Sequence, residues 1–354
     1  MTTPLTIALD AMGGDKAPDV VIEGVAIARE RYPQARFLLF GDRAKIEPLL
    51  AEKKNAAARE VCEVIHTDQV VTADAKPSQV LRQGRQTSMW LAADAVAQGR
   101  AAGLISAGNT GALLAVSKFV LRMLPGLARP ALAGFFPTAR GETVMLDFGA
   151  NIECDARNLV EFAVMGDVFA RTVLGIEQPI VGLLNVGSED LKGNDAVRDA
   201  AAILRDGRLP IRFHGFVEGD DIPAGTADVV VTDGFTGNIA LKVGEGTAKL
   251  YTHFLRDAFY NSFIARIGYA LARRALMKVK LRTDPRRYNG AMFLGLNGIA
   301  VKSHGGTDAV GFANAIGVVV DLVSGGFNDR IKDELAKLQT LQTPSTPSPQ
   351  AAAV

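Results

Sequence analysis

The chain has 354 residues, of which 48% are hydrophobic and 22% charged, and its net charge is +1. These values are typical of a folded globular protein and exclude a disordered chain, and the length allows a core that needs no metal or disulfide. The only cysteines, Cys62 and Cys154, form no CxxC pair, so we expect no disulfide framework, no structural zinc and a reducing cytoplasm. We also expect no signal peptide, and no run approaches the roughly 20 apolar residues of a membrane span.

Apolar runs that resemble strands alternate with helical stretches along almost the whole chain. We expect strands at 5–10, 36–40, 102–106, 131–136, 143–148, 180–186, 211–216, 228–233 and 299–303. We expect helices at 18–31, 77–99, 110–122, 157–174, 193–206, 238–259 and 307–323. Repeated strand–helix units predict an α/β fold with a doubly wound, mostly parallel sheet. We assign 1–339 to one large domain and 340–354, rich in Pro, Ser and Thr, to a disordered tail.

Six of the predicted strand ends share one composition, in which glycines stand beside Asp, Asn, Ser, Thr or Lys. Ligands of open α/β sheets collect at the carboxyl ends of strands, where helix N-termini supply N–H donors and positive potential. The six segments are ALDAMGGDKAP (8–18), LISAGNTGALLA (104–115), MLDFGAN (145–151), LLNVGSEDLKGND (183–195), VTDGFTGNIALK (231–242) and VKSHGGTDAVGFANAI (301–316).

One such loop is ordinary turn chemistry with a helix cap, whereas six in one chain predict a cleft that binds phosphate or another anion. Glycines let the backbone approach the ligand closely, and lysine adds positive charge. The candidate binding residues are Asp10, Gly13, Gly14, Asp15, Ser106, Gly108, Asn109, Thr110, Gly111, Asn151, Asn185, Asp233, Gly234, Thr236, Gly237, Lys302, Ser303, Gly305 and Gly306.

Other chemistries have weaker support in the sequence. There is no GxxxxGK[ST] segment, and GGDKAP is not a GxGxxG dinucleotide fingerprint. No GxSxG elbow occurs, and Ser303 and His304 are adjacent, so their side chains should diverge rather than pair. Cys154 could be a thiol nucleophile, although a buried, inert cysteine is the commoner case. Three aspartates could form a magnesium site, but we prefer to regard them as helix caps: Asp15, Asp147 and Asp233.

A basic segment at 256–287 contains nine Lys/Arg and two Asp, a net charge of +7 in a chain whose total is +1. From Phe259 onward the sequence fits one helix, whose apolar side chains fall within a sector of roughly 140°. We predict an amphipathic helical tip that protrudes from the domain and lies on an anionic membrane surface. Packing against the core or a second subunit, and docking of an acidic carrier protein, remain open. The candidate membrane contacts are Phe263, Ile264, Arg266, Ile267, Leu271 and Arg273.

The six loop motifs together, in this order from about residue 5 to 325, resemble those of the bacterial phosphate acyltransferases of phospholipid synthesis (acyl-ACP:phosphate acyltransferases). The resemblance implies an α/β/α sheet related to phosphotransacetylases and isopropylmalate dehydrogenases, and a homodimer. It implies transfer of a fatty acyl group from acyl carrier protein to inorganic phosphate. The acyl-phosphate would then pass to a membrane glycerol-3-phosphate acyltransferase, which suggests a cytoplasmic protein peripherally associated with the inner face of the membrane.

The same resemblance implies catalytic roles for the lysine of LKGN, Lys192, and the asparagine of FTGN, Asn238. His304 could protonate the leaving thiolate, or contact phosphate, or be structural. We expect no cofactor, no metal and no nucleic-acid partner. Two other functions stay open at this point: an NAD-dependent dehydrogenase of the isopropylmalate type, and a non-catalytic membrane scaffold for lipid enzymes.

Overall fold

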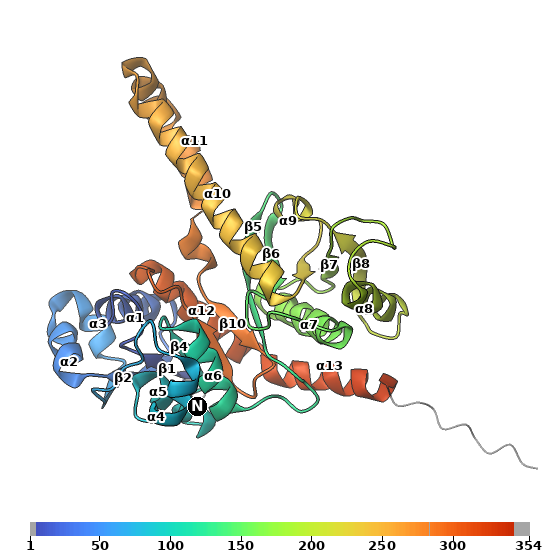
Figure 1. Ribbon diagram of the computed structural model, residues 1–354. Coiled ribbons are helices and arrows are strands. Elements are labelled where there is room, and N and C mark those ends of the chain that lie inside the picture. The colour runs from blue at the N-terminus through green and yellow to red at the C-terminus, as the bar shows by residue number, and fades with distance from the viewer. Residues whose placement is uncertain (1–4, 283, 343–354) are drawn as a thin grey trace, which may run out of the picture.

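An eleven-stranded sheet forms the centre of the molecule (Figure 1). The computed structural model describes residues 5–282 and 284–342. The strands lie in the spatial order β3-β2-β1-β4-β11-β10-β5-β6-β9-β7-β8. Their bounds are β1 Leu5–Asp10, β2 Ala35–Gly41, β3 Cys62–His66, β4 Gly103–Ser106, β5 Ala131–Thr138, β6 Gly141–Leu146, β7 Ile180–Leu184, β8 Arg212–Val217, β9 Val229–Val231, β10 Ala291–Leu294 and β11 Ile299–Lys302. All nine expected strands are confirmed, and the sequence did not reveal β3 and β10.

The strands form two parallel blocks that run in opposite directions. β3, β2, β1, β4 and β11 are parallel to one another, and so are β6, β9, β7 and β8. Between the blocks, β10 is antiparallel to β11 and β5, and β5 is antiparallel to β6. The six glycine-rich loops therefore fall into two groups that leave the sheet in opposite directions.

Helices cover both faces of the sheet, which confirms the predicted α/β/α layering. Along β1 the side chains alternate, so that Ile7 and Leu9 pack in one core cluster and Ala8 in the other. The first cluster includes apolar residues of α1, α7 and α12, and the second those of α5, α6 and α10. The helices are α1 Asp19–Arg31, α2 Arg43–Ala51, α3 Ala56–Arg59, α4 Pro77–Gln83, α5 Ser88–Ala97, α6 Thr110–Leu121, α7 Ala156–Phe169, α8 Asp195–Arg205, α9 Asp221–Ala224, α10 Gly234–Tyr260, α11 Phe263–Arg282, α12 Ala309–Ser324 and α13 Phe327–Gln342.

The helix predicted at 77–99 and the predicted start of the tail need correction. The helix expected at 77–99 is interrupted after Gln83, and Thr87 caps the second piece by accepting a hydrogen bond from the N–H of Trp90 at 3.4 Å. The tail was expected to begin at 340, but α13 continues to Gln342. The remaining tail residues, 343–354, lie outside the described residues.

Helices α10 and α11 form a hairpin that projects away from the rest of the molecule (Figure 1). The single helix predicted from Phe259 onward is wrong, because α10 ends at Tyr260 and α11 starts at Phe263. Ser262 starts the second helix by accepting a hydrogen bond from the N–H of Ala265 at 3.4 Å. The protruding tip itself was predicted correctly, and Ile264 and Leu271 are 80% and 84% exposed on it.

Among the described helices, no single one is both long and apolar enough to cross a bilayer. Ala309–Ser324 and Phe327–Ala336 form a bent pair that, by length and composition alone, could cross a bilayer.

Candidate functional site

The first group of loops, after β1, β4 and β11, is organised around a buried carboxylate. Asp10 ends β1, and its two oxygens accept hydrogen bonds from the hydroxyls of Ser88 and Ser106, each at 2.6 Å. Burial raises the pKa of Asp10, while these hydroxyls and the N–H of Met12 oppose the rise. A Cβ at Gly13 would lie 2.5 Å from Asp10 Oδ2, so only glycine lets this loop close over the carboxylate.

Lys302 is the partly buried cation of this first group. It ends β11, and its ammonium donates to the carbonyl oxygens of Ala107, at 3.3 Å, and Ser303. Burial lowers the pKa of Lys302 to about 8, against the opposing attraction of Asp10 and Asp15. A cation held with so little water at a glycine-rich strand end is suited to bind an anion, because the anion would supply the missing compensation.

The loop after β11 is fixed to both neighbouring loops. The N–H of Ser303 donates to Ser106 O at 3.0 Å, and the N–H of Asp15 donates to Gly305 O at 2.9 Å. His304 is exposed, and its Nδ1 accepts a hydrogen bond from the N–H of Gly306 at 3.1 Å. Because Nδ1 accepts this hydrogen bond, the proton of a neutral imidazole lies on Nε2, the ring nitrogen that does not bond to Gly306.

The side chain of Asn289 fixes the same loop through hydrogen bonds. Its Nδ2 donates to Ser303 Oγ at 2.8 Å and to Gly311 O at 2.7 Å, and its Oδ1 accepts from the N–H of His304 at 2.8 Å. Ser303 is therefore a buried structural hydroxyl, and no serine–histidine pair exists here, as expected. Sequence reasoning missed Asn289, although the Asn-Gly pair at 289–290 is a turn signal.

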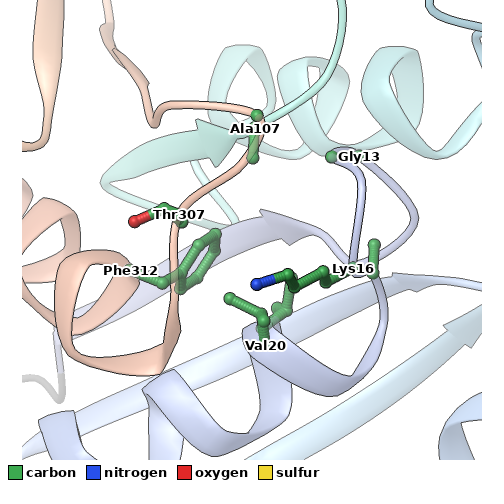
Figure 2. A pocket seen from close by; sticks show the side chains of 10 residues that line it. Gly13, Lys16, Val20, Ala107, Thr307 and Phe312 are labelled. Atoms are coloured by element: carbon green, nitrogen blue, oxygen red, sulfur yellow. The ribbon is translucent and has the colours of Figure 1, made fainter. Parts of the chain in front are cut away.

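A small cavity lies between the β1 and β11 loops. Its volume of about 10 Å³ has room for one water molecule. Figure 2 shows the side chains of Lys16 and Thr307, which come from these two loops and line it together with Gly13 and Phe312. The cavity is too small to hold phosphate.

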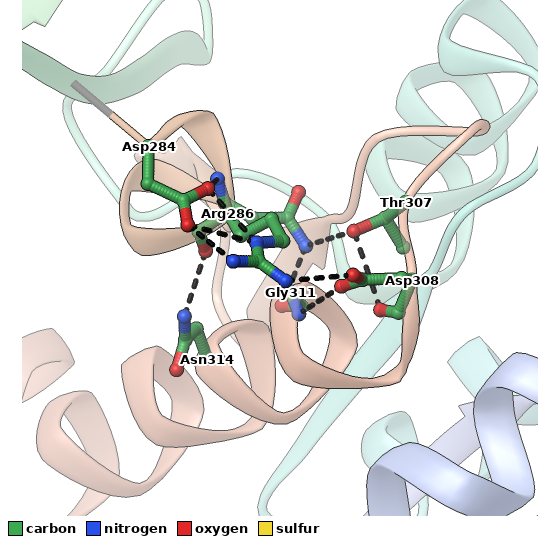
Figure 3. A network of polar contacts seen from close by, with 7 residues as sticks. Asp284, Arg286, Thr307, Asp308, Gly311 and Asn314 are labelled. Carbon is green, nitrogen blue, oxygen red and sulfur yellow. Dashed lines mark hydrogen bonds and ion pairs between the residues drawn. The ribbon is translucent and has the colours of Figure 1, made fainter. Parts of the chain in front are cut away.

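Farther along, the β11 loop connects to the base of the helical hairpin (Figure 3). Arg286 donates to Asp308 Oδ2 at 3.1 Å and from its Nε to both oxygens of Asp284 at 2.9 Å. Asn314 donates to the carbonyl of Arg286 at 2.7 Å. Arg286, one of the nine basic residues of the predicted membrane segment, therefore forms ion pairs within the protein, next to the loop that carries His304.

The second group of loops, after β6, β9 and β7, is organised around Asp147. Its Oδ1 accepts from the N–H groups of Leu132, Gly149 and Ala150 at 2.9, 3.2 and 3.0 Å. Its Oδ2 accepts from the backbone and the side-chain amide of Asn151, at 2.7 and 2.9 Å. Asp147 is therefore a buried structural anchor, and Asn151 uses its amide to hold it. Among the described residues, no group of three or more His, Cys, Asp or Glu is placed to hold a metal ion.

Helix α10 begins directly on the Asp147 loop. Asp233 caps it, accepting from the N–H and the hydroxyl of Thr236, both at 2.8 Å. A Cβ at Gly237 would lie 2.1 Å from the carbonyl oxygen of Asp147, so the helix can pack this closely only with glycine there. Asn238 lies on the exposed side of this first turn, within 4 Å of the Cβ position of Gly149.

The loop after β7 presents Lys192. Asn185 shapes this loop by donating to the carbonyls of Gly187, at 3.1 Å, and Lys192, at 3.2 Å. The side chain of Lys192 is exposed, and its strand neighbours β9, from which Asn238 follows. The two predicted catalytic residues thus come from the ends of adjacent strands.

Several predicted binding residues use their side chains to cap or close their own loops. Asn109 caps α6 through the N–H of Ala112 at 2.9 Å and donates to Ala73 O at 2.8 Å. Asn151, Asn185, Asp233 and Thr236 are engaged in the same manner. Such residues set the shape of the loops. The predicted site residues that face solvent from the two sets of loops include Asp15, Lys192, Asn238, His304, the partly exposed Lys302, and Thr110 and Gly111 in the first turn of α6.

The cysteines are poorly suited to nucleophilic attack. Burial raises the pKa of Cys62 to about 12. Burial, with the nearby charges of Asp147 and Asp233, also raises the pKa of Cys154 to about 12. Both thiols are therefore protonated near neutral pH, whereas a catalytic cysteine reacts as the thiolate.

Comparison with known proteins gives consistent matches over the whole chain. A family model described as "Fatty acid synthesis protein" matches residues 5–330. The chain is 66% identical over 352 residues to the phosphate acyltransferase of Paramagnetospirillum magneticum, covering 99% of each chain. It is 63% identical over 348 residues to the phosphate acyltransferase of Rhodospirillum rubrum, covering 98% of this chain and 99% of the relative.

Solved structures of two acyl-transfer enzymes share the fold. The EutD phosphotransacetylase from Staphylococcus aureus superposes with a TM-score of 0.58 at 17% identity, covering 90% of this chain and 94% of that one. A branched-chain phosphotransacylase from Enterococcus faecalis gives a TM-score of 0.55 at 14% identity, covering 90% and 99%. This likeness confirms the predicted phosphotransacetylase-like fold.

The low pKa of Lys302 makes a prediction about anion binding. Its charge is present below pH 8 and lost as the pH rises through 8, whereas inorganic phosphate is mostly the dianion at both pH 8 and pH 9. We expect the affinity for inorganic phosphate, measured by calorimetry, to fall about fivefold between pH 8 and 9. Lys302→Arg, which stays charged, should abolish this dependence. An affinity that is flat from pH 8 to 9 in the unmodified protein would exclude Lys302 from the anion site.

Proposed function

The chain belongs to the family of fatty acid synthesis proteins that includes the bacterial phosphate acyltransferases, and on this basis we propose that it transfers a fatty acyl group from acyl carrier protein to inorganic phosphate. Acyl transfer to phosphate is the activity of the family. The choice of acyl carrier protein as the donor is the further step proposed here. The family assignment favours this function over the dehydrogenase and the non-catalytic scaffold.

The observation that carries the proposal is a partly buried lysine at a glycine-rich strand end, with no activated side-chain nucleophile among the described site residues. Lys302 offers a desolvated cation, and the loops around it offer N–H groups, as an anionic substrate requires. Both cysteine thiols are protonated and Ser303 is buried. A reaction in which phosphate itself is the nucleophile needs none of these side chains to attack.

The chemistry is a direct displacement at a thioester. A phosphate oxygen attacks the carbonyl carbon, forming a tetrahedral oxyanion, and the carbon–sulfur bond then breaks to give acyl-phosphate and the carrier's thiolate. The protein contributes by holding the dianion beside the carbonyl and by stabilising the oxyanion. Lys192 and the amide of Asn238 are the donors proposed for the oxyanion, and the exposed His304 is the residue proposed to protonate the thiolate through Nε2–H.

Homodimerisation and membrane association complete the proposal. The hairpin exposes a series of large apolar side chains on both helices, which is more than a solvated surface needs. Basic side chains flank the apolar tip, as on helices that lie on anionic membranes. A long-chain acyl-phosphate is poorly soluble, and its consumer, a membrane glycerol-3-phosphate acyltransferase, would receive it directly at the inner face of the membrane.

The reaction itself is tested with the purified protein. We expect it to form acyl-phosphate from a long-chain acyl-ACP and inorganic phosphate, with release of the carrier thiol, in the presence of a metal chelator and without nucleotide. Omission of phosphate is the control. Release of thiol that does not depend on phosphate, or reduction of NAD by hydroxyacids, would contradict the proposal, and activity with acyl-CoA alone would contradict the donor.

Lys192→Ala and Asn238→Ala should each lower turnover about 10²-fold or more, the effect of losing one oxyanion donor. Lys332→Ala, which removes an exposed lysine on α13, is the control and should keep full activity. The melting temperature of each variant reports whether it folds. A folded variant with the activity of the unmodified protein would remove that residue from the mechanism.

The membrane element is tested by flotation with anionic liposomes. We expect the protein to float, less so at high salt, because each Lys/Arg near the surface contributes about 1 kcal/mol that salt screens. Ile267→Glu and Leu271→Glu should reduce flotation while turnover of soluble substrate is kept. Ile203→Glu, at an exposed apolar position on α8, is the matched control and should float normally. If the tip variants float like the unmodified protein, the tip does not contact lipid.

A further inference from the structure

Lys242 lies on α10 one turn beyond Asn238, at the i, i+4 position, so the two side chains share one face of the helix. The adjacent face is packed on the sheet, because Gly237, Leu241 and Gly244 are buried or partly buried. The face with Asn238 and Lys242 is exposed at the edge of this contact. Lys242 is the last residue of the VTDGFTGNIALK segment, but it is not among the candidate binding residues predicted from the sequence.

The strand register shows where this face of α10 lies relative to Lys302. Lys302 pairs with Ala291 across the β11–β10 ladder, so both side chains point to the same face of the sheet. The Cβ of Ala291 lies 3.5 Å from the Cβ position of Gly134 on β5. Phe136 follows Gly134 by two residues along β5, so its side chain points to the same face of the sheet.

Phe136 is the residue on which α10 rests. A Cβ at Gly244 would lie 2.8 Å from the ring of Phe136, and Leu241 belongs to the same apolar cluster as Phe136 and Ala291. Helix α10 therefore covers the face of the sheet from which Lys302 projects. The helix makes its contact with Phe136 about three turns after its start. Consistent with this placement, the charge of Lys242 acts to lower the pKa of Lys302.

Two ammonium groups that converge in this manner repel one another unless an anion lies between them. Glu245 now pairs with Lys242 at 2.9 Å, an exposed contact that is weak and easily exchanged. Lys302 has only carbonyl oxygens as hydrogen-bond acceptors. A dianion would satisfy both lysines better than these partners do.

We propose that Lys242 is the second cationic residue of the phosphate site, holding inorganic phosphate from α10 while Lys302 holds it from β11. The inference rests on the proposed function and assigns to it a residue that is not among the candidate binding residues predicted from the sequence. Phosphate held there lies about one helical turn, roughly 5 Å, from Asn238. The nucleophile and the proposed oxyanion donor are then positioned by one rigid helix.

The test compares Lys242→Ala, Lys242→Arg and the control Lys249→Ala, which removes another exposed lysine from the same helix. Two readouts are used: steady-state KM values for phosphate and for acyl-ACP, and calorimetric binding of inorganic phosphate alone. We expect Lys242→Ala to raise the KM for phosphate, and to weaken phosphate binding, about tenfold or more, as for a lost charge-assisted hydrogen bond. The KM for acyl-ACP should change less than about twofold, Lys242→Arg should restore much of the phosphate affinity, and Lys249→Ala should behave normally.

Phosphate binding and a phosphate KM that are unchanged in a folded Lys242→Ala variant would overturn the inference. A raised KM for acyl-ACP in place of phosphate would also overturn it and assign Lys242 to the donor. The calorimetric arm separates this result from failure of the proposed function, since it needs no turnover: a protein that binds phosphate through Lys242 but forms no acyl-phosphate contradicts only the proposed function.

Discussion

Helix α10 can begin where it does only because two of its first four residues have no side chain. A Cβ at Gly234 would lie 2.5 Å from Asn151 O, and one at Gly237 would lie 2.1 Å from Asp147 O. The Asp147 carboxylate, which accepts five hydrogen bonds, makes the loop beneath the helix rigid. From this fixed start, α10 carries Asn238, then Lys242 near the contact with Phe136 of β5, and finally the exposed hairpin. In the proposed function, catalysis, anion binding and the protruding tip thus share one helix.

The partly buried charge of Lys302 is the second constraint. Desolvation of an ammonium disfavours folding unless its partners compensate, and the lowered pKa shows that carbonyl groups and the attraction of Asp10 do so only in part. In the proposed site an anionic ligand would supply the rest, and it would bind more strongly there than at a hydrated surface lysine. Asp10 is fixed by two serines and does not compete for the ligand as a free carboxylate.

Most strands and many helices could be predicted from local sequence patterns. The relative directions of the strands could not. Continuous apolar runs identified nine strands, but not β3, CEVIH, which contains charged and polar residues, nor β10, which directly follows an Asn-Gly turn. Its insertion beside β5 reverses the second block, and that depends on contacts between residues distant in sequence. The Asn261-Ser262 pair was a readable cap signal that an unbroken apolar pattern concealed. Loop composition identified Lys302, and the resemblance to a known family identified Lys192. The position of Lys242 near the site depends on the packing of Gly244 against Phe136, which the sequence does not reveal.

In the proposed site, Lys302 at the end of β11 and Lys242 on α10 hold one anion between them. A crystal structure of the protein with bound inorganic phosphate tests this most directly. We predict one phosphate within hydrogen-bonding distance of the ammonium groups of both Lys302 and Lys242, on the side of α10 that carries Asn238. A phosphate held at the β6, β9 and β7 loops without contact to Lys302 would contradict the account, as would one held by the β1 and β11 loops alone.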